Sequence, residues 1–288
     1  MQDFPTIWFP HLNLEFFNID GVAFSIGGFD AMWYGVLIAI GMLTGYALAL
    51  WNAERTGFDK TLIDDFLPFA IIFGILGARL YYVIFSWDYY KDNLSSILNL
   101  RQGGLAIYGG IIAAVLYGIY FCHKRKVSFF SLADISMPSL LLGQAIGRYG
   151  NFINREVYGN YTDNIFAMRI LLEDAAITSE EIMNNLVTYM DQVYIQVHPT
   201  FFYESSINFC IAIALLIYTK RKRFDGEIFL LGMMGYGFIR FIIEGIRVDR
   251  LLIGNTPIAI SQLLGISIAI VSLILIFILN KKSKNQVG

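Results

Sequence analysis

Seven long runs of apolar residues follow one another along this chain, and they limit its fold more than any other feature. They cover residues 31–51, 66–85, 105–121, 129–146, 201–218, 228–246 and 258–279. A helix needs about 20 apolar residues to cross the hydrocarbon core of a bilayer, and each run is close to that length. Because 56% of the residues are hydrophobic and only 15% are charged, a soluble fold of this size could not hide its apolar surface. We therefore predict an all-α membrane protein with seven transmembrane helices.

Basic residues are concentrated in alternate connections between these runs. Lys and Arg gather at residues 124–126, at 220–223 and in the tail at 281–284, with Arg55 and Lys60 after the first run. The other connections carry fewer. Loops rich in Lys and Arg stay in the cytoplasm. The pattern therefore predicts a multi-pass protein with its N-terminus outside and its C-terminus in the cytoplasm.

One connection is much longer and more polar than the rest. Residues 149–197 include an acidic stretch from Glu173 to Glu181. A segment of this length is too long for a simple turn. We predict that it forms a small extracytoplasmic head between two membrane parts, residues 1–148 with four spans and residues 198–288 with three.

Cysteine and histidine patterns do not indicate a metal or redox site. Cys122 ends one apolar run and Cys210 lies within another, and the three histidines lack the spacing of metal ligands. The net charge of −2 gives no reason to expect nucleic-acid binding. We expect no metal, no cofactor and no nucleic-acid partner.

Charged residues inside or next to the apolar runs are costly in lipid and are usually functional. Arg79 lies in the second run, and Arg148 lies just beyond the fourth. Arg240, Glu244 and Arg247 share one face of the sixth helix because they are spaced i, i+4, i+7. Guanidinium groups near the outer leaflet suit an anion, and phospholipid phosphate is the abundant anion there. Local ion pairs, such as one between Arg240 and Glu244, are the alternative explanation.

Three glycine-rich or polar segments accompany these charges. Residues 143–156 contain Arg148, Asn151, Asn154 and Glu156, while residues 103–110 open the third run and residues 198–204 open the fifth. Glycines let a backbone approach a ligand or a neighbouring helix closely. Helix packing and helix capping are the competing interpretations for all three segments.

Taken together, these segments resemble the bacterial prolipoprotein diacylglyceryl transferases. The family signature G-R-x-G-N-F-x-N-x-E-x-x-G is matched by Gly147-Arg148-Tyr149-Gly150-Asn151-Phe152-Ile153-Asn154-Arg155-Glu156-Val157-Tyr158-Gly159. Three shorter motifs are matched by His198, Pro199, Tyr203 and Glu204, by Tyr236, Gly237, Arg240, Glu244 and Arg247, and by Trp33, Tyr34 and Gly35. The resemblance covers most of the chain, in order.

The resemblance implies both a fold and a reaction. Members of this family have seven spans, an outward N-terminus and a small periplasmic head in the bacterial cytoplasmic membrane. They move the diacylglyceryl group of phosphatidylglycerol to the lipobox cysteine thiol of a prolipoprotein signal peptide, which forms a thioether and releases glycerol phosphate. Membrane lipid and lipobox peptides are therefore the expected partners.

The resemblance also implies which residues act. For catalysis we expect Arg148, Arg240, Glu156, Tyr108 and Glu244. For substrate binding we expect Arg148 again, with Asn151, Asn154, Gly159, Tyr34, Tyr236, Arg247, His198, Tyr203 and Glu204. The departing group is a phosphate ester, whose developing charge Arg148 and Arg240 would stabilise. Glu156, Glu204 and Glu244 are the candidate acceptors of the thiol proton, and orienting Arg240 is the alternative role of Glu244.

Two positions depart from the family pattern. Tyr108 stands where some members carry a histidine in the third-run motif, and Met32 stands where some carry one before W-Y-G. A phenol is a poor base at neutral pH, so hydrogen-bond donation is the role left for Tyr108. The alternative function is a phospholipid-binding carrier or flippase without chemistry, which Arg79 in the second run favours. The sequence contains no G-x-S-x-G motif that would favour an intramembrane hydrolase.

Overall fold

The structure is a computed structural model that describes residues 4–99, 103–254 and 256–287. Seven of its helices are long and apolar enough to cross a membrane. They are α1 (Trp33–Thr56), α2 (Thr61–Phe85), α4 (Ile107–Arg125), α5 (Phe129–Asn154), α7 (Thr200–Tyr218), α8 (Glu227–Ile246) and α9 (Ile260–Val287). Each corresponds to one predicted run, so the prediction of a seven-helix membrane protein is confirmed.

The fourth of these helices extends further than the apolar run that predicts it. α5 continues to Asn154, past the predicted end at residue 146. Polar residues such as Arg148 and Asn151 end an apolar run, but they do not break a helix, because the backbone hydrogen bonds continue through them. Residues 147–154, the first part of the signature motif, therefore occupy the last two turns of α5, and residues 155–159 follow the helix.

The chain forms two compact units. The first comprises Met1–Ala47 and Ser136–Gly288, the second comprises Leu48–Ile135, and both α1 and α5 contribute to the two units. The predicted division at residues 148 and 197 remains a prediction.

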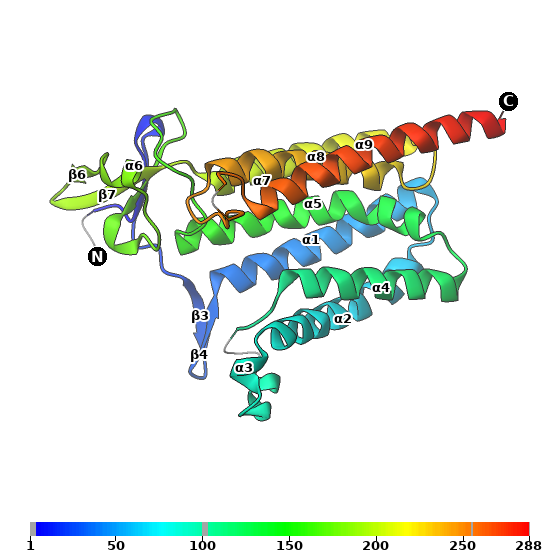
Figure 1. Ribbon diagram of the computed structural model, residues 1–288, viewed down its shortest axis with the longest axis horizontal. Coiled ribbons are helices and arrows are strands. Elements are labelled where there is room, and N and C mark those ends of the chain that lie inside the picture. Colours follow the sequence, from blue (N-terminus) through cyan, green and yellow to red (C-terminus); the bar gives the residue numbers. More distant parts are fainter. Residues whose placement is uncertain (1–3, 100–102, 255, 288) are drawn as a thin grey trace. The chain divides into compact units, whose positions relative to one another are not determined.

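The head of the first unit is built on an antiparallel sheet with the strand order β2-β1-β5-β7-β6. Its strands are β1 (Ile7–Phe9), β2 (Leu14–Phe16), β5 (Met168–Leu171), β6 (Val187–Tyr189) and β7 (Gln192–Val197), with the short helices η1 (Pro10–Leu12), η4 (Leu172–Asp174) and α6 (Glu180–Met183) between them. The register places Ile170 opposite both Ile7 and Ile195. The N-terminal segment is therefore part of the head, at the same end of this unit (Figure 1).

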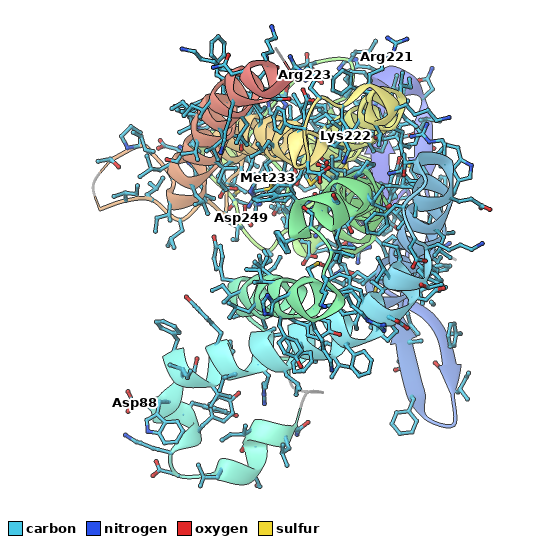
Figure 2. The ribbon with its side chains drawn as sticks, turned by 90° about the vertical axis from the view of Figure 1, so that its right-hand side faces the viewer. Asp88, Arg221, Lys222, Arg223, Met233 and Asp249 are labelled. Atoms are coloured by element: carbon cyan, nitrogen blue, oxygen red, sulfur yellow. The ribbon has the colours of Figure 1, made fainter. Side chains whose placement is uncertain are left out.

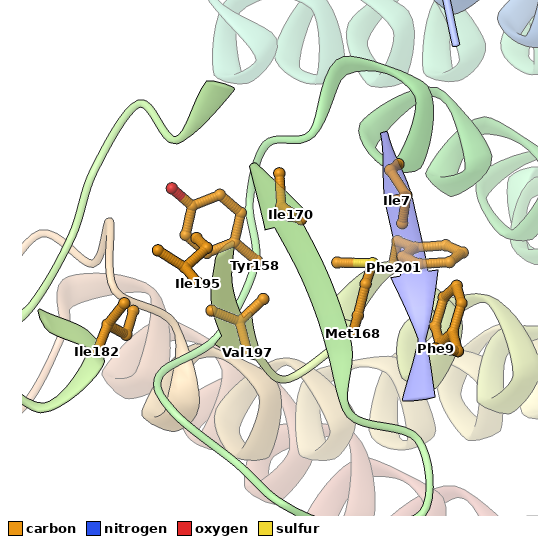
Figure 3. Close-up of a cluster of buried hydrophobic side chains, with 9 residues drawn as sticks. All are labelled: Ile7, Phe9, Tyr158, Met168, Ile170, Ile182, Ile195, Val197 and Phe201. Carbon is orange, nitrogen blue, oxygen red and sulfur yellow. The ribbon is translucent and has the colours of Figure 1, made fainter. Parts of the chain in front are cut away.

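A hydrophobic core fixes this sheet onto the ends of the helices. It consists of Ile7, Phe9, Tyr158, Met168, Ile170, Ile182, Ile195, Val197 and Phe201 (Figure 3). Ile7, Ile170 and Ile195 are fully buried. Because Tyr158 follows α5 and Phe201 begins α7, the same core holds the ends of both helices beside the head.

A two-stranded hairpin leads into α1. β3 (Val22–Ile26) pairs with β4 (Phe29–Met32) around Gly27 and Gly28, which both have positive φ as a tight hairpin turn requires. One face presents Ile26 and Phe29, while Ser25 donates a hydrogen bond to Asp30 on the other. The predicted start of the first span at residue 31 thus falls in β4, and the helix begins at Trp33.

Small residues let the helices of the first unit pack closely. A Cβ on Gly237 of α8 would lie 2.5 Å from the carbonyl oxygen of Gly265 in α9. A Cβ on Gly41 of α1 would lie 2.9 Å from the carbonyl oxygen of Gly143 in α5. Such backbone approach replaces the hydrophobic effect as a source of helix association in lipid.

The connection between α7 and α8 lies at the end of the first unit opposite the head. It contains the turn η5 (Thr219–Arg221) and the basic residues Arg221, Lys222 and Arg223 (Figure 2). Lys222 pairs with Asp225, and Arg223 pairs with the buried Glu227. These ion pairs close the end of the helix hairpin.

The second unit is built around α2 and α4. A Cβ on Gly77 of α2 would lie 2.6 Å from the carbonyl oxygen of Gly109 in α4, so the two helices cross at glycines. The short helices α3 (Trp87–Tyr90) and η2 (Leu94–Leu98) follow α2 and precede α4 along the chain.

Candidate active site

The last turns of α5 and the first turns of α7 bring an arginine and a glutamate together. Arg148 Nη2 donates to Glu204 Oε1 at 2.5 Å, and Arg148 Nη1 donates to Asn151 Oδ1 at 3.3 Å. Arg148 and Asn151 share a helix face because they are three residues apart. The Glu204 side chain is only 2% exposed, whereas Arg148 is 23% exposed. The pair is therefore buried on the carboxylate side and accessible on the guanidinium side.

A second arginine approaches the same carboxylate from α8. Arg240 Nη1 lies 3.8 Å from Glu204 Oε2, and Arg240 Nη2 lies 2.9 Å from Glu244 Oε2. The i, i+4 pair that the sequence predicts as an alternative thus exists, but it does not isolate Arg240. Glu204 lies between the two arginines, so both guanidinium groups converge on one point.

Arg240 retains an unused donor at this point. Its Nη1 atom is buried and makes no hydrogen bond to any residue in the described part of the chain. Glu244 Oε2 is in the same situation, although it lies within ion-pair distance of Arg240 and, at 3.5 Å, of Arg247. Buried polar atoms without hydrogen bonds are uncommon, and a catalytic role is one of their recognised explanations.

A chain of amide groups connects this arginine pair to a third carboxylate. Asn151 Nδ2 donates to Glu156 Oε1 at 2.9 Å, and Asn154 Nδ2 lies 3.3 Å from the same oxygen. Arg155 and Val157, on either side of Glu156, have positive φ values of 53° and 60°. A β-branched residue such as valine rarely adopts this conformation, which costs roughly 1–3 kcal/mol. This strained turn holds Glu156 at the end of α5, where its N–H donates to the carbonyl of Asn151 at 3.1 Å.

Gly159 lies where three segments of the first unit meet. Its N–H donates to the carbonyl of His198 at 3.0 Å, and it forms a β-bridge with Arg247. A Cβ at this position would lie 2.7 Å from the His198 Cβ and 3.0 Å from the carbonyl oxygen of Ile246. Glycine is therefore required here by packing, and its expected contact with substrate remains a prediction.

Arg247 is held mainly by an aspartate that the sequence reasoning missed. Its Nε and Nη2 atoms donate to the two carboxylate oxygens of Asp249 at 2.8 and 2.6 Å (Asp249 is labelled in Figure 2). Burial works to raise the pKa of Asp249, but the hydrogen bonds and charge of Arg247 outweigh it and lower that pKa. The two-residue spacing of Arg247 and Asp249 was the only signal in the sequence.

His198 and Tyr203 form a separate polar contact with the head. His198 Nδ1 lies 3.3 Å from the Tyr203 hydroxyl, which also accepts a hydrogen bond from Asn164 Nδ2 at 2.9 Å. Burial lowers the pKa of His198, so the imidazole is neutral at neutral pH. Tyr203 thus binds the head, while its neighbour Glu204 binds Arg148.

The predicted aromatic residues lie in three different places. Tyr34, 38% exposed at the start of α1, packs against Gly150 of α5 so closely that a Cβ there would overlap its ring. Tyr236 of α8 packs against the buried cluster around Met137 and Leu141. Tyr108 is the second residue of α4, in the second unit, and is 49% exposed.

Comparison with known proteins places these motifs in one family. Residues 21–278 match the family described as prolipoprotein diacylglyceryl transferase. Similar proteins from Bacillus cereus (strain Q1), Bacillus mycoides (strain KBAB4) and Bacillus anthracis are each named phosphatidylglycerol–prolipoprotein diacylglyceryl transferase. Each is 44% identical to this chain over 264 residues, which are 92% of this chain and 93% of the relative. The chain, a multi-pass membrane protein, therefore belongs to the prolipoprotein diacylglyceryl transferase family.

Proposed function

We propose that this protein transfers the diacylglyceryl group of phosphatidylglycerol to the lipobox cysteine thiol of a prolipoprotein signal peptide. The names of its relatives state diacylglyceryl transfer between phosphatidylglycerol and a prolipoprotein, and one observation in the structure supports this activity best. Arg148 and Arg240 approach opposite oxygens of the buried Glu204, at 2.5 and 3.8 Å. Two guanidinium groups around one point form the donor array that a phosphate group requires.

The proposed reaction is a displacement at carbon. The cysteine sulfur attacks the carbon of the diacylglycerol part that is bonded to a phosphate oxygen, a C–S bond forms, and the C–O bond between that carbon and the phosphate breaks. The electron pair of that bond stays on the phosphate oxygen, so the departing glycerol phosphate gains a negative charge. Arginines that contact the phosphate stabilise the transition state more than the ground state, because the charge develops as the bond breaks.

The free donors of the two arginines are where the phosphate would bind. A guanidinium group has five N–H donors. Arg148 directs two of its nitrogen atoms to Glu204 and Asn151, and Arg240 has the unused Nη1. Glu204 balances the arginine charges in the absence of lipid and holds both side chains in place.

Glu156 is the best placed of the three candidate proton acceptors. Taking up a proton would cost Glu204 its ion pair with Arg148, and it would cost Glu244 its ion pair with Arg240. Glu156 is bound by the neutral amides of Asn151 and Asn154. A proton from the incoming thiol would therefore go to Glu156 at the lowest electrostatic cost.

The reaction would take place at the outer surface of the bacterial cytoplasmic membrane. The N-terminal strands and residues 168–197 share one sheet, as an arrangement with both outside requires. The basic turn that contains Lys222 and Arg223 lies at the opposite end of the first unit, as expected for the cytoplasmic side (Figure 2). Both substrates are anchored in lipid, so they would reach the site sideways from the membrane.

Arg148→Ala provides the direct test. We expect transfer of labelled diacylglyceryl from phosphatidylglycerol to a lipobox peptide to fall by about 10²–10³. Arg221→Ala, a change at an exposed arginine in the turn after α7, is the matched control and should transfer at the wild-type rate. Release of glycerol phosphate, measured in parallel, separates transfer from lipid carriage, since a carrier releases none. An Arg148→Ala protein with wild-type activity would exclude the phosphate role of this arginine.

A further inference from the structure

Arg79 in α2 directs its whole guanidinium group toward backbone carbonyls of residues 96–99 and 103–104. The side chain is buried, at 7% exposure. Nε donates to Ile97 at 2.8 Å, Nη1 donates to Gly103 at 2.8 Å and Gly104 at 3.0 Å, and Nη2 donates to Ser96 at 2.7 Å and Asn99 at 3.1 Å. A guanidinium group has five N–H donors, so every one of them is used.

Because all five donors of Arg79 are used, its guanidinium group cannot donate to a further ligand. No donor is left for a lipid phosphate, and among the described residues no carboxylate lies within ion-pair distance of it. Carbonyl dipoles at the end of η2 and the ring of Tyr90, whose centre lies 5.2 Å from Cζ, balance the charge instead. The lipid-carrier reading, which rests on Arg79, therefore loses its main support.

Two of the carbonyls that Arg79 binds belong to glycines with an unusual backbone conformation. Gly103 and Gly104 have φ values of 80° and 79°, which favour glycine. A Cβ on Gly104 would lie 2.5 Å from Arg79 Nη1 and 2.8 Å from Tyr82 Cε1. The glycine and the arginine thus fit each other, and neither can be replaced without moving the chain.

A second contact joins α2 to the residues just before α4. The N–H of Ala106 donates to the carbonyl of Ala78, next to Arg79, at 3.0 Å. Ala106 precedes the first helical residue, Ile107, and supplies no side-chain cap. Arg79 and the Ala78 carbonyl thus contact both ends of residues 103–106, which lead directly into the first turn of α4 and Tyr108.

We propose that Arg79 is a positioning residue that fixes residues 103–106 and thereby sets the place of Tyr108 for the diacylglyceryl transfer. This inference rests on the proposed function. It predicts that the number and planar geometry of the donors matter rather than the positive charge, so lysine, a point charge with three donors, cannot replace arginine.

The test is a double-mutant cycle on the transfer rate. We expect Arg79→Lys to lower kcat by about tenfold, the effect of roughly one to two lost hydrogen bonds on the barrier, with KM for phosphatidylglycerol unchanged. In a Tyr108→Phe background the same change should have little further effect, because Arg79 acts through Tyr108. Gly104→Ala should reproduce the loss of kcat, since the added methyl displaces the same contact. Hydrogen exchange should show faster opening at 104–110 and unchanged protection in the first half of α2 in both variants.

Each other outcome overturns the inference. A raised KM with kcat retained would make Arg79 a lipid ligand, and full additivity with Tyr108→Phe would make it independent of Tyr108. A variant with loss of protection throughout α2 and α4 would show that Arg79 serves general stability alone. Wild-type protein assayed in parallel separates the two proposals: its failure to transfer refutes the proposed function, whereas wild-type activity in Arg79→Lys refutes only this inference.

Discussion

Removing Arg148 should have two separable consequences, one for stability and one for the reaction. Arg148→Ala leaves the Glu204 carboxylate, 2% exposed, with Arg240 at 3.8 Å as its nearest cation among the described residues. Breaking a buried ion pair costs about 3–5 kcal/mol, and the remaining arginine offsets part of this, so we expect a loss of about 2–3 kcal/mol. The transfer rate should fall by about 10²–10³ because a donor to the developing charge is gone.

Glu204→Gln separates the two effects. The double variant Arg148→Ala with Glu204→Gln no longer buries an unpaired carboxylate, so thermal unfolding in lipid nanodiscs should show most of the lost stability restored. Its transfer rate should still be at least about 10² below that of Glu204→Gln alone. A double variant as active as the single glutamine variant would refute the reasoning, because Arg148 would then serve only to neutralise Glu204.

Three further predictions concern packing, hydrogen bonding and pH. Gly150→Ala should destabilise the protein by about 1–3 kcal/mol in thermal unfolding, because the added methyl overlaps the ring of Tyr34. Gly147→Ala is the control and should not destabilise it, because its methyl would meet no atom within 4 Å. Equal melting temperatures of the two variants would contradict this prediction. Tyr108→Phe should stay folded and lower kcat by about tenfold through the loss of one hydrogen-bond donor, and an unchanged rate would remove Tyr108 from the reaction. Burial lowers the pKa of His198 below its unfolded value of 6.5. The contribution of the neutral imidazole to folding stability should therefore be complete above pH 6.5 and decline as the pH falls below 6.5. If acidification lowers the melting temperature of the wild type no more than that of His198→Gln, this prediction is contradicted.

The long helices were predictable, but the head was only partly so. Each span is an apolar run long enough to be recognised on its own. The strand from Ile7 to Phe9 has three residues, too few to show a period, and its partner β5 begins at Met168. Pairing between segments so far apart leaves no local signal, so the sequence indicated a head at residues 149–197 without its N-terminal strands.

The candidate site, too, was only partly predictable from the sequence. The spacing of Arg240 and Glu244 on one helix face could be predicted, because it depends only on the helical period. The approach of Arg148 and Arg240 to Glu204 depends on how α5, α7 and α8 pack, which no spacing encodes. The roles proposed here for the site residues remain predictions.

Two arginines have hydrogen-bond acceptors that the sequence pattern does not indicate. Charged residues in apolar runs are usually functional, so the sequence suggests a ligand or an ion-pair partner for each of them. Backbone carbonyls of a neighbouring loop are a third kind of partner that the sequence does not reveal. Arg79 donates its hydrogen bonds to backbone carbonyls such as those of Ile97 and Gly103, and Arg247 donates two to the carboxylate of Asp249. Neither arrangement can be read from the apolar pattern, because the acceptors lie in segments without a period.

The position of the lipid phosphate relative to the two arginines tests the central claim most directly. Solid-state NMR can measure dipolar coupling between the ³¹P nucleus of phosphatidylglycerol and ¹⁵N-labelled guanidinium groups of the protein in a bilayer. We predict a coupling that corresponds to hydrogen-bonding distance in the wild-type protein, weakened in Arg148→Lys and in Arg240→Lys and retained in Arg221→Lys. Absence of that coupling in wild type, or the same coupling in both Arg148→Lys and Arg240→Lys, would contradict the account.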